Sequence, residues 1–226
     1  MANLKMWLLP TRNRPKAMEA CIEAMRLTGD IPEVAVMVDG PMYNIDWPKH
    51  WHIHESYGHL EMQRALNALY RLYPKEKTYG ILTDQSRPQT PGWATKLEEA
   101  AGDHMIAMCN TTKNRVNPRT GLRRITTTCT GGELIRAIGW VYLDRVVHLY
   151  GDDAWEDIGY ALNIIRYLPE VVILALLKRD GEVEIDANHH RRWQGKSYMA
   201  TDAAEFEAWK ATEFPALLKR MEKFKQ

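Results

Sequence analysis

The sequence predicts an α/β fold in which a mostly parallel sheet is flanked by helices. Short apolar runs of strand length alternate with longer segments whose apolar residues recur every three or four positions, which is the pattern of βαβ units. No linker, internal repeat or low-complexity segment divides the 226 residues. We therefore expect a single domain over residues 1–226, with a first half of about 1–109 and a second half of about 110–226.

The first half of the chain contains four apolar runs of strand length. They predict strands at 6–9, 34–38, 79–82 and 105–109. Apolar stripes predict helices from about 15, over 62–73 and from 91 to about 100. Pro15 suits the first position of a helix, and Thr90 before Pro91 resembles an N-cap followed by such a proline. The stretch 43–58, rich in Trp and His, is expected to be irregular.

The second half begins with a polar, basic segment, 110–124, which we expect to be a loop. Strands are predicted at 125–129 and 146–149, and a hairpin at 171–177 and 183–185 across Asp180-Gly181. Gly131-Gly132 is expected to open a helix that runs to about 138. Another helix carries a stripe of Trp155, Ile158, Leu162 and Ile165, and a C-terminal helix is expected from about 203, with an interruption near Pro215.

The composition excludes several classes of protein. A net charge of +1 gives no general attraction to nucleic acid or to an anionic membrane. The three cysteines, Cys21, Cys109 and Cys129, are widely spaced, so we expect reduced thiols rather than disulfides or a zinc site. The N-terminal apolar run stops at Pro10, which is too short for a signal peptide or a membrane span. We therefore expect a cytoplasmic protein without a membrane segment.

Polar residues follow three of the predicted strands at the point where each strand ends. The first strand is followed by 10–14, the second by Asp39 and the third by 83–86. Ligands of open α/β sheets bind at the carboxyl ends of the strands. The sequence therefore predicts a ligand site where these three segments meet.

The residue types at these strand ends suit a nucleotide diphosphate. Arg12 and Arg14 stand just before a predicted helix N-terminus, which favours phosphate groups. Asp39 is placed to accept hydrogen bonds from a base or a ribose. Asp84 can hold Mg²⁺ or Mn²⁺ against a diphosphate, because these cations prefer oxygen ligands. Simple turn or capping roles for the same residues stay open.

The order of these segments resembles the GT-A glycosyltransferases, whose fold is a Rossmann-like, nucleotide-sugar-binding sheet with a D-x-D metal motif. The resemblance covers about residues 6–196. It rests on L-L-P-T-R-N-R-P, V-M-V-D-G, M-Q-R-A-L-N-A-L, I-L-T-D-Q-S, P-G-W-A-T-K-L-E-E-A, D-D-A-W-E-D and H-H-R-R-W-Q-G-K, in that order. The chain looks most similar to small members of the type that phages encode, which places it in a host cytoplasm.

The resemblance implies a nucleoside-diphosphate sugar as donor, a UDP-sugar above all, and Mn²⁺ or Mg²⁺ as cofactor. The residues implied to contact the donor are Pro10, Thr11, Arg12, Arg14, Asp39, Arg64, Asn67, Thr83, Asp84, Gln85 and Lys196. The implied metal ligands are Asp84, Ser86 and His190. The motif Asp84-Gln85-Ser86 has one carboxylate where the family has two, so we expect a weaker metal site.

An acidic cluster precedes and opens the helix that contains Trp155. Asp153 and Asp157 lie four residues apart on one face, and either is expected to act as general base on an acceptor hydroxyl, in an inverting reaction. Acidic residues also stabilise a helix N-terminus, so a capping role stays open. On the acceptor side, the resemblance implies contacts from Trp93, Gly131, Gly132 and Asp152.

The acceptor is suggested by basic residues alone. Lys113, Arg115, Arg119, Arg123 and Arg124, with Arg191 and Arg192, are suited to contact phosphates. A hydroxymethylated pyrimidine in phage DNA is therefore one hypothesis for the acceptor.

Two other classes of function stay open. A sugar nucleotidyltransferase uses a similar sheet, but it normally has a glycine-rich loop after the first strand, and 10–15 contains no glycine. The thinned metal motif also permits a non-catalytic nucleotide-binding module.

Overall fold

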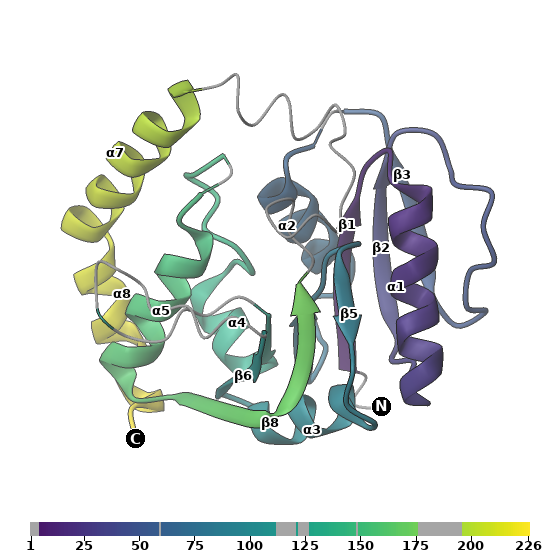
Figure 1. The fold of residues 1–226 in the computed structure, drawn as a ribbon. Coiled ribbons are helices and arrows are strands. Elements are labelled where there is room, and N and C mark those ends of the chain that lie inside the picture. Colours follow the sequence, from purple (N-terminus) through teal and green to yellow (C-terminus); the bar gives the residue numbers. More distant parts are fainter. Residues whose placement is uncertain (1–4, 59, 112–120, 122–126, 148, 176–195) are drawn as a thin grey trace.

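The computed structural model describes residues 5–58, 60–111, 121, 127–147, 149–175 and 196–226. These residues form one mixed sheet covered by helices on both faces (Figure 1). The strands are β1 (Lys5–Thr11), β2 (Val34–Asp39), β3 (His52–Ser56), β4 (Thr78–Ile81), β5 (Ser86–Pro88), β6 (Ile106–Asn110), β7 (Thr128–Gly131) and β8 (Ile165–Ala175). The helices are α1 (Pro15–Thr28), α2 (Met62–Leu72), α3 (Trp93–Ala101), α4 (Gly132–Ile138), α5 (Gly151–Leu162), α7 (Lys196–Thr212), α8 (Phe214–Met221) and the 3₁₀ turn η2 (Glu222–Phe224).

The sheet has the strand order β3-β2-β1-β4-β7-β6-β8-β5. β1 pairs in parallel with both β2 and β4, and β3 extends this parallel group beside β2. β7 runs antiparallel between β4 and β6, β8 is parallel to β6, and β5 is antiparallel to β8. The parallel group brings the carboxyl ends of β1, β2, β3 and β4 to one edge of the sheet. α1 begins at that edge, at the top of Figure 1.

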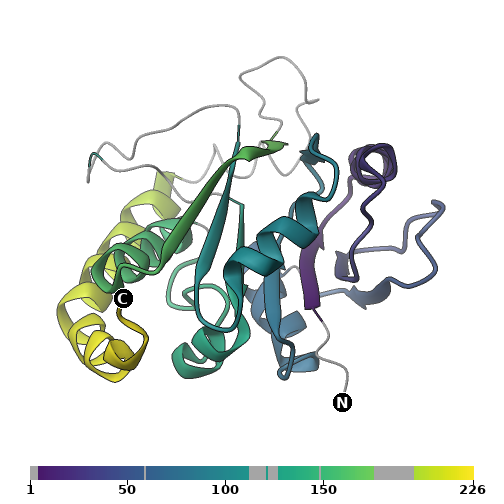
Figure 2. The ribbon, with the colours of Figure 1, turned by 90° about the horizontal axis from the view of Figure 1, so that it is seen from below.

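Alternating side chains of the strands supply two hydrophobic cores, one on each face of the sheet. On β1, Trp7 and Leu9 face the core under α1 and α3, whereas Met6 and Leu8 face the core under α2, α4, α5 and α8. Figure 2 shows α1 and the C-terminal helices on opposite sides of the molecule. The predicted α/β architecture is thus confirmed, and the sheet is mixed because β5 and β7 run antiparallel to their neighbours.

Several predicted elements differ from the structure. The stretch 43–58, expected to be irregular, contributes the edge strand β3. The predicted strand at 146–149 is absent from its described residues: the backbone N–H groups of Val147 and Leu149 donate to the buried Asp202 carboxylate of α7 instead of to a sheet. Ile165 opens β8, because α5 ends at Leu162, with Asn163 in the left-handed conformation (φ 58°).

Some helix boundaries also differ from the prediction, because residues distant in the sequence determine where the helix starts. Thr90 does not cap α3, since its hydroxyl donates to Glu170 O and accepts from Val172 N. The carboxylate of Asp30 caps that helix by accepting from Ala94 N at 2.9 Å and from Thr95 N at 3.4 Å. The C-terminal helix starts at 196 rather than near 203, and it breaks before Phe214-Pro215 as expected.

Other predicted segments are only partly described. The strand expected at 125–129 appears as β7, and residues 122–126 lie outside the described part. The second strand of the predicted hairpin, 183–185, also lies outside it. In the described part of the chain, no helix is both long and apolar enough to cross a membrane.

Candidate functional site

Asp84 lies just beyond β4, at the edge where the parallel strands end. Its side chain is buried, with 3% of the residue exposed. Thr11, at the end of β1, donates its hydroxyl to Asp84 Oδ2 at 2.8 Å. Arg14, at the start of α1, places Nη1 3.3 Å from Asp84 Oδ1. The carboxylate is therefore fixed by the neighbouring strand end through one neutral and one charged donor.

A second arginine–aspartate pair lies beside the first. Arg12 Nε is 3.2 Å from Oδ2 of Asp39, which closes β2 and is 5% exposed. Arg12 and Arg14 both come from the segment between β1 and α1, so this segment carries two guanidinium groups over two buried carboxylates. The predicted convergence of the three strand ends is seen in these contacts.

Tyr43 holds this segment in place. Its hydroxyl lies 3.1 Å from Thr11 Oγ1 and accepts a hydrogen bond from Arg14 N at 3.0 Å. Since the Thr11 proton is given to Asp84, Tyr43 donates to Thr11. Burial raises the pKa of Tyr43, which keeps the phenol protonated and able to donate. The ring also stacks on Trp47. Sequence reasoning missed Tyr43, because it falls in the stretch that we expected to be irregular.

The turn between β4 and β5 directs its polar groups unequally. Ser86 is 2% exposed, and its Oγ accepts from Thr83 N at 3.1 Å, so the hydroxyl serves the turn itself. Thr83 closes the same turn through its carbonyl, which accepts from Ser86 N at 2.9 Å. The buried Nε2 of Gln85 has no hydrogen-bond partner among the residues that the structure describes.

Arg87 adds a third guanidinium group to the site, beside Asp84, and sequence reasoning assigned it no role. Its Nη1 donates to the main-chain carbonyl of Asp84 at 2.8 Å and to that of Ser86 at 2.9 Å. The signal available in the sequence was its place in the polar run that follows β4. Two arginines thus flank Asp84, one at its carboxylate and one at its carbonyl.

In the structure, the side chains of Asp84 and Ser86, which we predicted as metal ligands, are not arranged to bind a divalent cation. Both Asp84 oxygens contact protein donors, and the Ser86 hydroxyl faces inward. No three His, Cys, Asp or Glu side chains form a group suited to a metal within the described ranges. The third predicted ligand, His190, lies outside those ranges. The residues that match the D-x-D motif therefore do not form a metal site within the described part of the chain.

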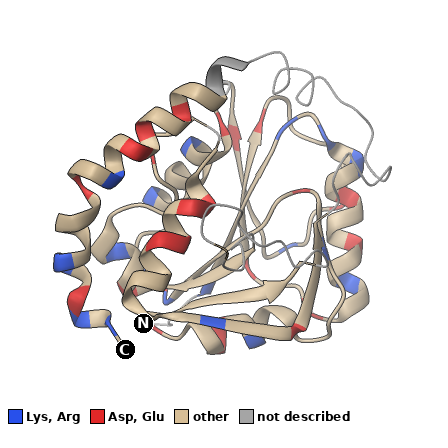
Figure 3. Cartoon of the chain, turned by 60° about the vertical axis from the view of Figure 1, so that its left-hand side comes forward, with Lys and Arg blue, Asp and Glu red and all other residues tan. Residues whose placement is uncertain are grey.

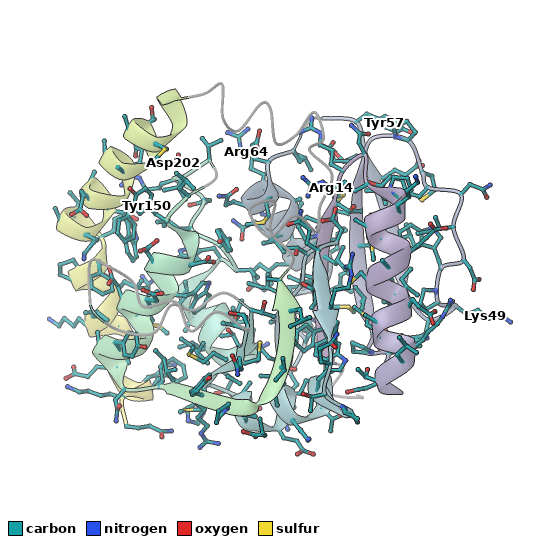
Figure 4. The ribbon with its side chains drawn as sticks, in the orientation of Figure 1. Arg14, Lys49, Tyr57, Arg64, Tyr150 and Asp202 are labelled. Atoms are coloured by element: carbon teal, nitrogen blue, oxygen red, sulfur yellow. The ribbon has the colours of Figure 1, made fainter. Side chains whose placement is uncertain are left out.

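The two α2 residues predicted to contact the donor have different surroundings. Arg64 is exposed near the start of α2, and Figure 4 shows it on the same upper side of the molecule as Arg14. Asn67 is buried. Its Oδ1 accepts from Val141 N at 2.9 Å and from Tyr142 N at 3.1 Å, and its Nδ2 donates to Tyr142 O at 2.8 Å. We therefore correct the role of Asn67 from donor contact to anchor of the segment before α5.

Three residues assigned to the acceptor lie away from this edge. Trp93 is fully buried against Trp7, with ring centroids 4.6 Å apart, so it offers no surface to an acceptor. Gly131 pairs with Thr78 at the opposite end of β4, and Gly132 N donates to Lys77 O. A side chain at either glycine would clash with backbone about 2 Å away, which explains the pair as close packing.

Two acidic residues of α5 contact side chains of other segments. Asp152 Oδ1 accepts from Tyr142 Oη at 2.7 Å, and Asp157 Oδ2 lies 3.0 Å from Lys210 Nζ on α7. Asp153 is buried in the first turn of α5. The ion pair with Lys210 gives Asp157 a structural role, and the assignment of Asp153 as general base stays a prediction. Figure 3 shows that α7 carries charges of both signs.

Figure 4 places the start of α5 relative to the arginines. Tyr150, the residue before α5, lies on the same upper side as Arg64 and Arg14. Lys196, predicted to reach the diphosphate, opens α7, and its side chain is outside the described part.

The fold matches solved glycosyltransferase structures, although no family model and no curated protein matches the sequence. Glucosyl-3-phosphoglycerate synthase from Mycobacterium tuberculosis, in complex with Mn²⁺, UDP and glucosyl-3-phosphoglycerate, superposes with a TM-score of 0.59 at 12% identity, over 91% of this chain and 81% of that chain. The same enzyme with Mn²⁺, UDP-glucose and phosphoglyceric acid gives a TM-score of 0.59 at 12% identity, over 91% and 80% of the two chains.

TarS from S. aureus is also similar. Its 1–349 structure gives a TM-score of 0.56 at 11% identity, over 93% of this chain and 73% of that chain. A longer TarS structure gives 0.54 at 11% identity, and the match covers 87% of this chain and 44% of that one. At such identities these likenesses establish the fold, which is of the GT-A type.

Proposed function

We propose that this chain is a glycosyltransferase that moves a sugar from a nucleoside-diphosphate sugar to an acceptor hydroxyl. The observation that supports it best is the double pair Arg12–Asp39 and Arg14–Asp84, where adjacent parallel strands end beside the start of α1. In a GT-A fold this edge is where a nucleotide-sugar ligand is expected.

The donor is proposed to lie across the strand ends with its nucleoside toward β2. Asp39 would accept hydrogen bonds from the base or the ribose. The diphosphate would face Arg12, Arg14 and the positive end of the α1 dipole. A UDP-sugar is the donor that we favour, since UDP and UDP-glucose are bound by the similarly folded synthase.

Asp153 is proposed as the general base of an inverting transfer. Its carboxylate would take the proton of the acceptor hydroxyl while the hydroxyl oxygen attacks the anomeric carbon of the sugar. The bond from that carbon to the diphosphate breaks, and the departing oxygen keeps the electron pair. Guanidinium groups at Asp84 would stabilise the negative charge that develops there.

The acceptor follows from neither the site nor the fold. The basic segment that suggested a modified base in DNA falls largely within 112–126, outside the described residues apart from 121. DNA therefore stays a prediction. A steep dependence of binding on salt would support it, because phosphate contacts release counterions.

A thermal-shift screen of nucleoside diphosphates and their sugars tests the donor assignment. A ligand at a hundred times its Kd stabilises the folded state by about 2.7 kcal/mol, a shift of roughly 5–10 °C at this size. We expect a shift with UDP-sugars in the parent chain and in Arg26→Met, a control at the other end of α1, where Arg26 pairs with the exposed Asp46. Arg12→Met is expected to lose it. Equal, negligible shifts with every nucleotide would refute the proposal.

A further inference from the structure

We infer that the positive charge facing the donor diphosphate comes from Arg14 and Arg87 around Asp84, and that nucleotide binding by this chain requires no divalent cation. The inference rests on the proposed function and specifies how its donor site works. It concerns the position that a D-x-D motif would give to a metal.

Asp84 is already engaged on both of its carboxylate oxygens. Thr11 donates to Oδ2 at 2.8 Å, and Arg14 contacts Oδ1 at 3.3 Å. Mg²⁺ and Mn²⁺ prefer several oxygen ligands in octahedral geometry, and Mg²⁺ holds them at about 2.0–2.1 Å. A divalent ion at this carboxylate would stand beside the Arg14 guanidinium and be repelled by it.

Ser86 cannot supply the carboxylate that the motif lacks. Ser86 takes the place of the second aspartate in the motif, and its buried hydroxyl is used by Thr83 N within the turn. Rotation of the Ser86 side chain toward an ion would take the acceptor away from the part-buried backbone N–H of Thr83, which costs up to about 1–3 kcal/mol. The Ser86 hydroxyl therefore stabilises the turn and is not directed toward an ion.

Arg87 differs from the other two arginines in the charge that it adds to the site. Arg12 and Arg14 each face a buried aspartate, which offsets part of their positive charge. Arg87 instead donates to two main-chain carbonyls, at 2.8 and 2.9 Å, so it adds a positive charge to the site. A guanidinium has five N–H donors in a planar fork, which suits two phosphate oxygens at once. Asp84 then acts as a positioning residue that aims Arg14.

The test measures UDP and UMP binding by calorimetry in EDTA and again in Mn²⁺. We expect UDP to bind in EDTA with a Kd within about twofold of the value in Mn²⁺, and more tightly than UMP, because only UDP has the β-phosphate. Arg87→Met should weaken UDP binding roughly tenfold and remove the preference over UMP. Arg26→Met should bind as the parent does.

Loss of Arg14 alone would remove the charged donor from the buried Asp84 carboxylate, so Arg14→Met is combined with Asp84→Asn to keep this pair neutral. This double variant should also lose most of its UDP affinity, with its folding checked by circular dichroism. UDP binding that vanishes in EDTA and returns with Mn²⁺ would overturn the inference and leave the proposed function standing. UDP binding in EDTA that neither variant weakens would overturn the arginine assignment. Absence of nucleotide binding under both conditions would refute the proposed function itself.

Discussion

The hydroxyl of Thr11 donates to the carboxylate of Asp84 at 2.8 Å, which joins the end of β1 to the end of β4 across 73 residues of sequence. This bond holds the two strand ends next to each other. It also sets the direction in which Asp84 presents its other oxygen to Arg14.

Replacement of Thr11 by valine removes that donor while it keeps the shape of the side chain. A buried carboxylate that loses a hydrogen bond costs about 1–3 kcal/mol, so we expect Thr11→Val to unfold at lower denaturant concentration and to bind UDP more weakly. Thr28→Val is the matched control, because Thr28 donates only to Met25 O at the other end of α1. The two variants would contradict this view of the site if they bound UDP equally well.

Asn67 supports a different prediction, one of stability without any loss of binding. Its three hydrogen bonds hold Val141 and Tyr142, and both partners are buried. We expect Asn67→Ala to lower the free energy of unfolding by about 2–4 kcal/mol. The UDP affinity of the folded variant should be that of the parent. An affinity loss with unchanged stability would restore Asn67 as a donor contact.

The two carboxylates of α5 are expected to separate in kinetics. Asp153→Asn should reduce sugar transfer by about 10²–10⁴-fold and leave UDP binding intact, as expected for a general base. Asp157→Asn should keep turnover and lose about 1 kcal/mol of stability or less, since it breaks an ion pair with the partly exposed Lys210. If Asp157→Asn lost turnover and Asp153→Asn kept it, Asp157 would be the general base and Asp153 the structural residue.

The cysteines are predicted to be unreactive in the native protein. All three are free and buried, and burial raises the pKa of Cys21 and of Cys109 to about 12 and that of Cys129 higher still. At pH 8 they are therefore neutral thiols, and the thiolate is the species that reacts with a disulfide reagent. We expect almost no reaction with Ellman's reagent until denaturant is added, and then three equivalents per chain. Rapid native labelling would show that the packing around Cys21 opens.

Local patterns were enough to predict the elements that build the edge. The apolar runs before Thr11, Asp39 and Asp84 are fully buried strands, and Pro15 starts α1 as its fixed φ favours. Because parallel strands bring their carboxyl ends together, the meeting of these residues followed from the strand assignment.

Contacts between distant residues could not be predicted in this way. Asp30 caps α3 from more than 60 residues away, so the local signal at Thr90 was misleading. The residue type of Ser86 allows it to bind a metal, which is why it was predicted as a ligand. The direction of its hydroxyl is set by the turn, where it accepts from Thr83 N, and the sequence does not show that direction. β3 lacked an apolar run, since it is an edge strand whose side chains are only partly buried.

Under the proposed function, the nucleotide binds where β1, β2 and β4 end. Photolabelling with 5-azido-UDP, followed by peptide mass spectrometry, tests this location directly. We predict a label between Pro10 and Arg14 or between Asp39 and Tyr43, and we predict that excess UDP removes it. A label that UDP removes at the hollow lined by Tyr160, Asn163 and Tyr167, with none at the strand ends, would contradict the account.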